Sequence, residues 1–348
     1  MIWWLLVTRM KTEDFQYTLP PECIAQEPVE PRDSSRLLVL DRKSDSLQHR
    51  VFHQILDYFN PGDVLVLNQT RVIPARVIAH KLTGGRVELL LLRKEGDVSW
   101  EALVGGKKIR EGTRLKVTDN LMATVQDDLG GSRRRVVFNQ PVEPFLSKVG
   151  EMPLPPYIHT HLSNPERYQT VYSSVEGSAA APTAGLHFTP ALLEKLEQKG
   201  IKIARLTLHV GLDTFAPVTE ENVEEHVIHT EWCEMAEEAA RVINEASVNG
   251  GRVIAAGTTS VRTLETGALF AEPGKRVGAF TGATSLFILP GYTFKAVDAV
   301  ITNFHLPRST LLMLVSAFAG RERIISAYQT AVNEGYRFYS FGDAMLIL

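Results

Sequence analysis

Two hydrophobic patterns alternate along most of the chain. Short apolar runs typical of buried strands cover residues 201–210, 252–256 and 299–302. Patterns typical of helices accompany them at residues 191–199, 237–249 and 323–333. The first of these helices has clear ends, because Thr189 can cap it, Pro190 suits its first position and Gly200 can stop it. Strands that alternate with helices predict an α/β sheet with covering helices.

Residues 71–152 follow another pattern, in which short strands are separated by turn residues. The expected strands cover residues 86–92, 99–104, 113–117, 121–126 and 134–138. Hairpin turns are expected at Gly84–Gly85, Gly96–Asp97, Gly105–Gly106, Asp119–Asn120 and Gly130–Gly131. Such spacing favours a small closed antiparallel β-barrel. Prolines at 153, 155 and 156 mark the exit. We therefore expect a barrel domain, residues 71–152, inserted into a discontinuous α/β domain of residues 10–70 and 153–348.

Composition sets broad limits. With 348 residues, 44% of them hydrophobic, the chain can bury a sizeable core and form two domains. Cys23 and Cys233 form neither a CxxC motif nor a disulfide framework, which favours structural roles and a reducing cytoplasm. The apolar residues 1–7 are far fewer than the ~20 that a membrane span needs, and they lack the marks of a signal peptide. We expect residues 1–9 to be a disordered or upstream-start extension, and the protein to be a monomer that does not enter the membrane.

Charge is distributed unevenly between the two expected domains. Residues 71–148 contain 15 Lys and Arg against 9 Asp and Glu, whereas the whole chain has 37 against 40. A basic barrel on an acidic body suits a surface that follows phosphates, which supply most nonspecific affinity for nucleic acid. The run Arg133-Arg134-Arg135 is more typical of a solvated hairpin.

Residues 250–265, GGRVIAAGTTSVRTLE, indicate a corner that can bind an anion. A buried strand leads to a turn at Gly257, and Thr258, Thr259 and Ser260 can cap the helix that follows. The N–H groups and dipole of that helix, with Arg262 as a bidentate clamp, would hold a carboxylate or phosphate. The alternative is an ordinary strand-to-helix turn in which Arg262 pairs with Glu265. This segment alone fits the anion-binding corner and the ordinary turn equally well.

A second segment, GSAAAPTAGLHF at residues 177–188, presents His187 on a backbone of small residues. Small residues allow close approach by a ligand. A buried histidine that only satisfies a backbone carbonyl is the alternative.

Together with six further segments, these two carry a family resemblance. The six are FQYTLP (15–20), NQTRVIPARV (68–77), YQTVYS (168–173), HVGLDTFAPV (209–218), HVIHTE (226–231) and TNFHLPRSTLLMLVSAFAG (302–320). From about residue 10 to the C-terminus the chain resembles the S-adenosylmethionine:tRNA ribosyltransferase-isomerases of queuosine biosynthesis. Gln69, Ala179 and Ile228 depart from the Asp or Asn, Val and Met expected there.

The resemblance implies a reaction and its partners. S-adenosylmethionine would be a co-substrate, with no permanently bound cofactor and no metal. Its ribosyl group would be transferred and isomerised onto 7-aminomethyl-7-deazaguanine at the wobble position of tRNA. Epoxyqueuosine tRNA, adenine and methionine would be the products. The resemblance also implies the α/β body with an inserted barrel.

This chemistry needs a base for a carbon-bound 5′ hydrogen, an acid for the departing adenine and a group that holds the methionine carboxylate. The candidates for proton transfer are His187, Asp213, His226, His229, Glu231 and His305. The candidates for holding the methionine or a phosphate are Gly257, Thr258, Thr259, Ser260 and Arg262. The candidates for RNA binding are Arg71 and Arg76. Asn303 and His305 follow an apolar strand, where α/β sheets commonly place ligands.

Two other classes of function fit part of the sequence. A metal-dependent hydrolase could use His226, His229 and Glu231, but HxxH lacks the helical spacing of HExxH, and such an enzyme gives no reason for a basic barrel. A non-catalytic RNA-binding factor explains the barrel but not the histidine-rich second half.

Overall fold

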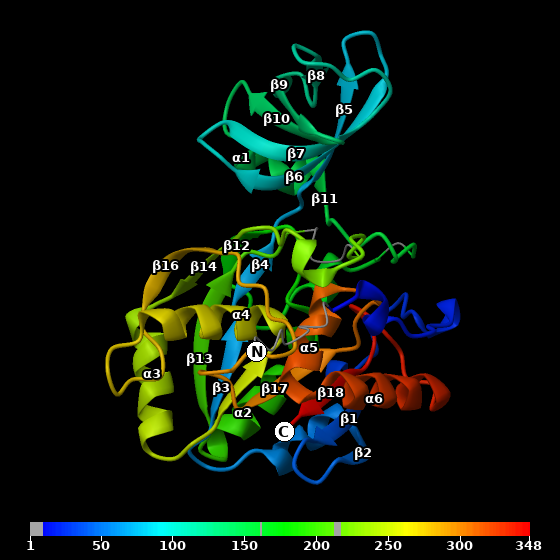
Figure 1. Ribbon diagram of the computed structural model, residues 1–348. Coiled ribbons are helices and arrows are strands. Elements are labelled where there is room, and N and C mark those ends of the chain that lie inside the picture. Colours follow the sequence, from blue (N-terminus) through cyan, green and yellow to red (C-terminus); the bar gives the residue numbers. More distant parts are fainter. Residues whose placement is uncertain (1–9, 161, 212–216) are drawn as a thin grey trace, which may run out of the picture.

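The computed structural model describes residues 10–160, 162–211 and 217–348. Its body is built on a nine-stranded sheet in the order β16-β14-β13-β3-β15-β17-β18-β1-β2 (Figure 1). These strands are β1 (Arg36–Asp41), β2 (Ser46–Val51), β3 (Val64–Asn68), β13 (Lys202–Leu208), β14 (Glu231–Met235), β15 (Val253–Ala256), β16 (Phe280–Thr284), β17 (Ala299–Asn303) and β18 (Ala344–Ile347). The neighbours β13, β3, β15 and β17 are parallel, so their carboxyl ends lie at one edge of the sheet.

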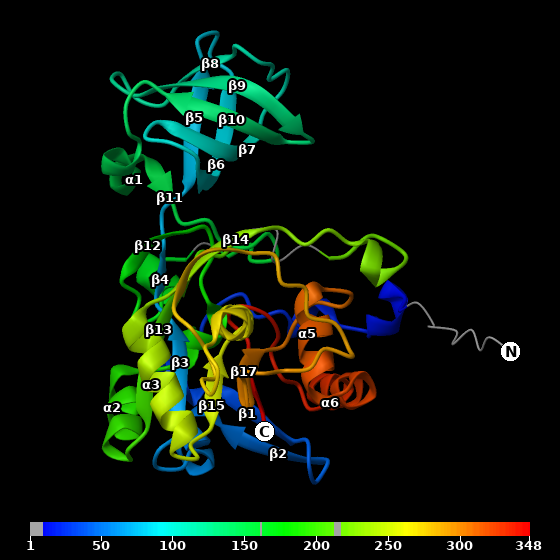
Figure 2. The ribbon, with the colours of Figure 1, turned by 60° about the vertical axis from the view of Figure 1, so that its left-hand side comes forward.

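Helices cover both faces of the sheet, as Figure 2 shows. The helices of the body are α2 (Pro190–Gln198), α3 (Glu237–Val248), α4 (Thr258–Gly267), α5 (Thr310–Ala319) and α6 (Arg321–Asn333). In β3, Val64 and Val66 pack with residues of α3 to α6, while Leu65 and Leu67 pack with α2 and the 3-10 helix Phe52–Tyr58. Burial on both faces explains why the central strands read as unbroken apolar runs. The α/β prediction is confirmed.

The second lobe is a small antiparallel barrel, as predicted. Six strands close through the β5–β8 pairing, in the order β5-β6-β7-β10-β9-β8, and β11 extends the sheet beside β5. Their bounds are β5 (Arg76–Lys81), β6 (Arg86–Lys94), β7 (Ser99–Gly105), β8 (Arg114–Lys116), β9 (Met122–Gly130), β10 (Arg133–Phe138) and β11 (Gly150–Glu151), with α1 at Glu143–Val149. Alternate residues of β7 are buried in a separate barrel core that includes Trp100 and Ala102.

One predicted hairpin is wrong. The turn at Gly105–Gly106 does not join neighbouring strands, because β7 pairs with β6 and β10, whereas β8 pairs with β9 and β5. The chain there crosses from one part of the barrel to another. The other four predicted turns each join strands that pair with one another.

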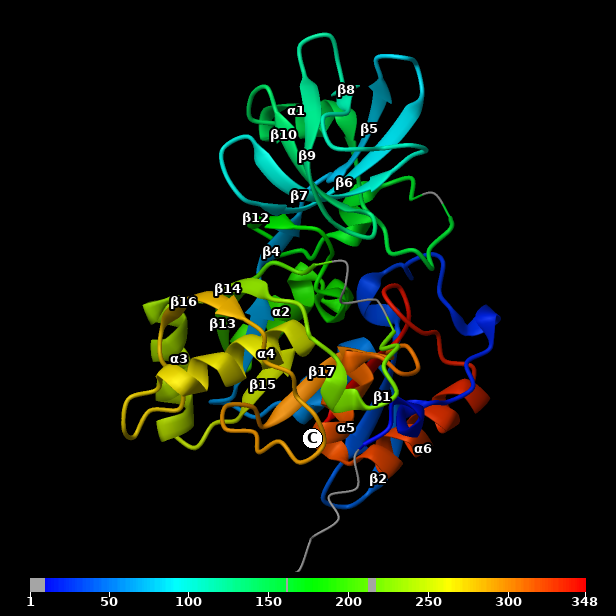
Figure 3. The ribbon, with the colours of Figure 1, turned by 45° about the horizontal axis from the view of Figure 1, so that its top comes forward.

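The barrel stands beyond the edge of the body where β3 ends, as Figure 1 and Figure 3 show. Strand β4 (Thr70–Val72) belongs to the body side of this connection, since it pairs with β12 (Val175–Ser178) and not with the barrel. The two segments that connect the barrel to the body lie close together at Pro74 and Gly150. A Cβ atom on Gly150 would lie 1.9 Å from the Pro74 carbonyl oxygen. Only glycine allows this approach.

In the described part of the chain, no helix combines the length and apolar character needed to cross a membrane.

Candidate active site

Polar side chains meet at the carboxyl ends of the parallel strands. Asn68 ends β3, Gly257 follows β15, and Asn303 ends β17. A small hollow at this edge is lined by Thr183, Val210, Gly257, Thr259, Asn303 and His305, among others. A second hollow shares Thr183, Asn303 and His305 with the first and adds Tyr157, Tyr339 and Ser340. Sheets of this kind bind ligands outside the carboxyl ends of their strands, so this edge is the candidate active site.

The amino end of α4 forms one wall of the first hollow. Gly257 precedes the helix with φ 92, a backbone conformation that favours glycine, and no described side chain caps the helix. The predicted cap by Thr258, Thr259 or Ser260 is therefore wrong, since the helix already begins at Thr258. Ser260 is fully buried and donates to the Ala256 carbonyl 2.8 Å away, which commits its hydroxyl to the helix. The backbone N–H groups of the first turn remain suited to an anion.

Asn68 supports this wall, and the sequence analysis missed it. Its side-chain nitrogen donates to Thr259 Oγ1 at 3.2 Å and to the Leu208 carbonyl at 3.0 Å. Its oxygen accepts from the backbone nitrogens of Thr70 and Leu208. The signal was present in the sequence, because Asn68 directly follows the apolar run of residues 64–67, as Asn303 follows that of β17.

Arg262 does not pair with Glu265, so that alternative is wrong. Glu265 is fully buried and accepts from the Tyr292 hydroxyl at 3.0 Å and from the backbone nitrogens of Lys295, Ala296 and Val297. Arg262 turns the other way, to Glu231 on the neighbouring strand β14.

Each of the three guanidinium nitrogens of Arg262 has a partner inside the protein. It forms an ion pair with Glu231 and donates to the carbonyls of Leu286 at 3.2 Å and Thr284 at 3.4 Å. Only 5% of the Arg262 side chain and 2% of the Glu231 side chain are exposed. A clamp on a substrate carboxylate would require this buried pair to break, which is costly.

Glu231 in turn orients His229. Glu231 Oε1 lies 3.2 Å from His229 Nε2 and accepts from the Gly211 nitrogen at 3.0 Å. Burial alone would raise the pKa of Glu231, but the charge of Arg262 and the contact with His229 outweigh it and lower this pKa. An ionised carboxylate that holds an imidazole is the arrangement that prepares a histidine for proton transfer.

His187 and His305 are buried and uncharged. His187 Nδ1 lies 2.8 Å from Ser35 Oγ, and its Nε2 lies 3.2 Å from the side-chain nitrogen of Asn303. Burial, with a smaller contribution from Arg337 and Arg32, lowers the pKa of His187 to about 3. Burial alone lowers the pKa of His305, whose Nε2 lies 2.7 Å from Thr302 Oγ1, to about 3. Both imidazoles are thus hydrogen-bonding groups more than proton carriers at neutral pH.

The acid–base candidates do not all meet at this edge. His187 contacts Asn303 and His305 lines both hollows, whereas His229 and Glu231 are not among the lining residues of either hollow. His226 Nδ1 pairs with Glu220 Oε2 at 3.0 Å, beside another pocket that is lined by Lys11, Thr12 and Arg308. Asp213 lies outside the described residues. Among the described residues, no group of three or more His, Cys, Asp and Glu side chains could hold a metal ion.

The basic residues of the barrel fall into two groups. Arg133, Arg134 and Arg135 pair with carboxylates of neighbouring strands and turns, which fits the interpretation of a solvated hairpin. By contrast, no described carboxylate pairs with Lys107, Lys108 or Arg110 of the loop between β7 and β8, and all three are exposed. Lys81 of β5 donates to the carbonyls of Lys107 and Lys108 and so fixes this loop.

The two predicted RNA-binding arginines lie at the connection between the lobes. Arg71, on β4, lies 2.5 Å from Glu166 and donates to Ser173 Oγ at 3.0 Å. Arg76, on β5, lies 3.3 Å from Glu88. About a third of each arginine side chain is exposed, at 31% and 32%.

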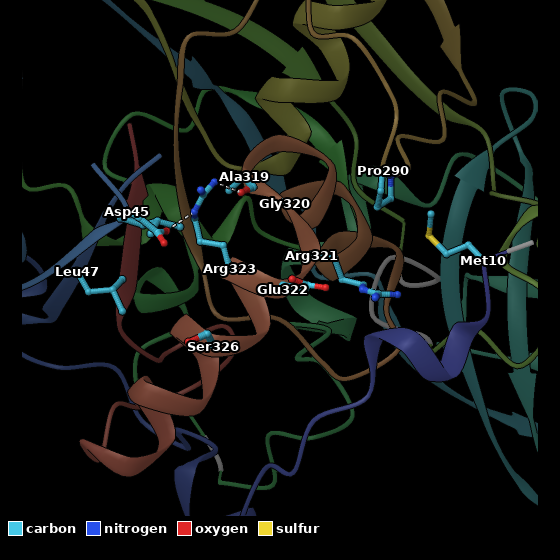
Figure 4. A pocket seen from close by; sticks show the side chains of 11 residues that line it. Met10, Asp45, Leu47, Pro290, Ala319, Gly320, Arg321, Glu322, Arg323 and Ser326 are labelled. Carbon is cyan, nitrogen blue, oxygen red and sulfur yellow. Dashed lines mark hydrogen bonds and ion pairs between the residues drawn. The ribbon is translucent and has the colours of Figure 1, made fainter. Parts of the chain in front are cut away.

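A pocket larger than either hollow lies elsewhere, and Figure 4 shows it between the β1–β2 turn and the start of α6. It has a volume of about 710 Å³ and shares no lining residue with the two hollows. Arg323 there is paired with Asp45 and donates to the Ala319 carbonyl at 2.7 Å. Arg321 lies 3.4 Å from Asp14. Asp45, Arg321 and Arg323 are thus already paired, and we assign this pocket no part in the site.

Comparison with known proteins identifies relatives over nearly the whole chain. A family model described as queuosine biosynthesis protein matches residues 12–347. A curated relative from Moorella thermoacetica, S-adenosylmethionine:tRNA ribosyltransferase-isomerase, is 56% identical over 346 residues, which cover 97% of this chain and 100% of the relative. A crystal structure of the S-adenosylmethionine tRNA ribosyltransferase from Thermotoga maritima is 42% identical, with a TM-score of 0.56, and covers 96% of this chain and 100% of that one.

Proposed function

The chain belongs to the queuosine biosynthesis protein family, and on this premise we propose that it is an S-adenosylmethionine:tRNA ribosyltransferase-isomerase. It transfers the ribosyl group of S-adenosylmethionine to 7-aminomethyl-7-deazaguanine at the tRNA wobble position and isomerises it to give epoxyqueuosine. Adenine and methionine are released. The observation that carries this proposal is the full-length match to a 56% identical relative of that name. The nucleophile is the substrate amine, so the protein needs to supply only binding and proton transfer.

We place the methionine carboxylate at the amino end of α4. Thr258 and Thr259 of the first turn line the hollow. The N–H groups of a first turn have no partners within their helix, and the helix dipole favours a negative charge there. Arg262 is removed from the predicted clamp, because its guanidinium already holds Glu231. Its role is to keep Glu231 charged and in place.

For proton transfer we propose His229. A neutral imidazole held by the ionised Glu231 can accept the 5′ proton that the adjacent sulfonium has acidified. The imidazolium formed in this way is stabilised by the same carboxylate and can then protonate the departing adenine. The proton lost by carbon therefore leaves on adenine, and the histidine is regenerated.

We propose that the tRNA lies across both lobes. The exposed loop with Lys107, Lys108 and Arg110 supplies unpaired positive charge for backbone phosphates. Arg71 and Arg76 lie between this loop and the strand ends. Their ion pairs are partly exposed, and surface pairs are worth about 0–1 kcal/mol, so a phosphate can replace the carboxylate. We also propose that the enzyme acts in the cytoplasm and as a monomer.

Mass spectrometry of the products tests the function. Purified protein incubated with S-adenosylmethionine and tRNA that carries 7-aminomethyl-7-deazaguanine should release adenine and methionine and leave epoxyqueuosine in the tRNA. Saturating substrates that yield neither small product would refute the assignment. EDTA should leave the rate unchanged. A rate that falls with EDTA and returns with zinc would support the metal-dependent alternative.

A further inference from the structure

Asn303 carries a buried acceptor that has no partner. It ends β17, is 3% exposed and lines both hollows. Its side-chain nitrogen donates to the Tyr339 carbonyl at 3.0 Å and to His187 Nε2 at 3.2 Å. Its side-chain oxygen, Oδ1, is buried and has no hydrogen-bond partner among the described residues. Buried acceptors are rarely left in this state, so one with no partner that lines a hollow points to a ligand.

The neighbours of Asn303 fix which way its amide faces. The Tyr339 carbonyl can only accept, so the amide nitrogen must face it, and a flipped amide would set two carbonyl oxygens together. His187 accepts at Nε2 and so carries its proton on Nδ1, from which it donates to Ser35 Oγ. The His187 ring also stacks on Phe52, with centroids 4.9 Å apart. Oδ1 is therefore the atom that the amide leaves for a ligand.

Several other polar groups of this wall already have partners. His305 Nε2 lies 2.7 Å from Thr302 Oγ1, and the Tyr157 hydroxyl lies 2.7 Å from Ser340 Oγ. The His305 carbonyl accepts from the Tyr17 hydroxyl at 2.5 Å. Asn303, whose Oδ1 has no partner among the described residues, and Thr258 and Thr259, at the amino end of α4, thus line the same hollow. We take them as its acceptor wall and its N–H donor wall.

The N–H donors suit an anionic group of a ligand, and the acceptor suits a cationic group that carries N–H bonds. Together they fit a ligand in which two such groups lie close to each other. An α-amino acid meets this requirement, because its carboxylate and ammonium share one carbon atom. Resting on the function proposed above, we propose that Asn303 Oδ1 accepts a hydrogen bond from the α-ammonium of the methionine moiety of S-adenosylmethionine. His187 is the positioning residue that holds the amide in this orientation.

Binding measured with three ligands tests this assignment. The ligands are S-adenosylmethionine, its analogue without the α-amino group, and 5′-methylthioadenosine, which lacks the whole amino acid. Asn303→Leu should weaken S-adenosylmethionine binding roughly 10- to 100-fold, the size of a lost charge-assisted hydrogen bond. It should leave the dissociation constants of the other two ligands unchanged. His187→Phe should show the same selectivity with a smaller loss.

Ser316→Ala is the matched control. The Ser316 hydroxyl is also buried and has no partner in the described part of the chain, but Ser316 lines neither hollow. This variant should bind all three ligands as the unaltered protein does.

Several results would overturn the proposal. An equal loss for 5′-methylthioadenosine would move the contact of Asn303 to the nucleoside, and an equal loss for the deaminated analogue would exclude the ammonium. Unchanged binding of S-adenosylmethionine would remove Asn303 from the site. A crystal structure of the unaltered protein with S-adenosylmethionine decides the question even if the variants fail to fold, since the ammonium must lie within hydrogen-bonding distance of Oδ1. Failure of the unaltered protein to bind the donor at all would instead refute the proposed function.

Discussion

Glu231 is an ionised carboxylate with only 2% of its side chain exposed, so its surroundings must supply compensation. Arg262 provides the charge, while Gly211 and His229 provide further hydrogen-bonding contacts. One of the two interpretations of the sequence paired Arg262 with Glu265, three positions later on the same helix. The actual partner lies 31 residues earlier, on β14, and becomes a neighbour only when the sheet forms. Ion pairs of this kind cannot be read from local spacing.

Removing Arg262 should therefore lower stability and turnover more than it weakens the binding of S-adenosylmethionine. Arg262→Ala would leave a buried carboxylate without its cation, a change that typically costs about 3–5 kcal/mol. Arg262→Lys should recover only part of this, because lysine cannot reach the same carbonyls with a planar fork. Urea unfolding and turnover rates of both variants measure the effect. Full stability with weakened S-adenosylmethionine binding would return Arg262 to the role of a carboxylate clamp.

The buried histidines predict how stability depends on pH. The pKa of His187 falls from its ordinary 6.5 to about 3 in the folded protein, so the unfolded chain binds the extra proton first. The contribution of the neutral His187 to the free energy of unfolding is complete above pH 6.5 and is lost as the pH falls toward 3. The loss approaches ~1.4 kcal/mol per pH unit for each such histidine. The His187→Phe variant lacks this pH-dependent part of the unfolding free energy. The difference in unfolding free energy between the unaltered protein and the variant should therefore shrink as the pH falls. A difference that stays constant with pH would show that His187 has the same pKa in the folded and the unfolded chain.

At the level of elements, the sequence predicted what local patterns control. Residues 253–256 were expected to be a strand and 237–249 a helix, and β15 and α3 match them closely, since burial on one or both faces shapes the apolar pattern directly. The turn at Gly105–Gly106 was expected to join a hairpin, but turn residues show only that the chain bends. Which strand lies next to β7 depends on how the barrel closes.

Gly150 is an element-scale requirement that no local pattern reveals. A Cβ atom there would lie 1.9 Å from the Pro74 oxygen and 2.8 Å from the Leu146 oxygen, so Gly150→Ala must push the two barrel connections apart. We expect a loss of about 1–3 kcal/mol, as in other overpacked sites. Gly282→Ala is the control, because a Cβ atom on this strand glycine would have no described heavy atom outside its chain neighbours within 4 Å. This variant should leave the free energy of unfolding unchanged. Equal unfolding midpoints for the two variants in urea would contradict this close crossing.

At the scale of the whole molecule, the question is how two lobes act on one RNA. The parallel strands end on the side of the body where the barrel stands, and the chain passes between the lobes at β4 and β11 (Figure 1). A tRNA whose wobble base enters at the strand ends can reach the barrel with its neighbouring phosphates. The sequence revealed that the barrel is basic. It could not show that the triple-arginine run is neutralised by carboxylates while the loop after β7 is not, because those pairs join different strands and turns.

The RNA path predicts different effects for two pairs of exposed lysines. Reversing the charge of Lys107 and Lys108 should weaken tRNA binding and flatten its salt dependence, by about one unit of slope for each phosphate that the variant no longer binds. The same reversal at Lys195 and Lys202, which are exposed on α2 and at the opposite end of β13, changes the net charge equally and should leave the slope unaltered. Charge reversal at Arg71 and Arg76 should weaken tRNA binding and flatten its salt dependence in the same way as the reversal at Lys107 and Lys108.

Fluorescence titrations of tRNA over a range of salt concentrations measure the slopes, and calorimetry should show unchanged S-adenosylmethionine affinity in every variant. If the donor affinity fell together with tRNA affinity in a folded protein, the division between an RNA-binding barrel and a donor-binding body would be wrong.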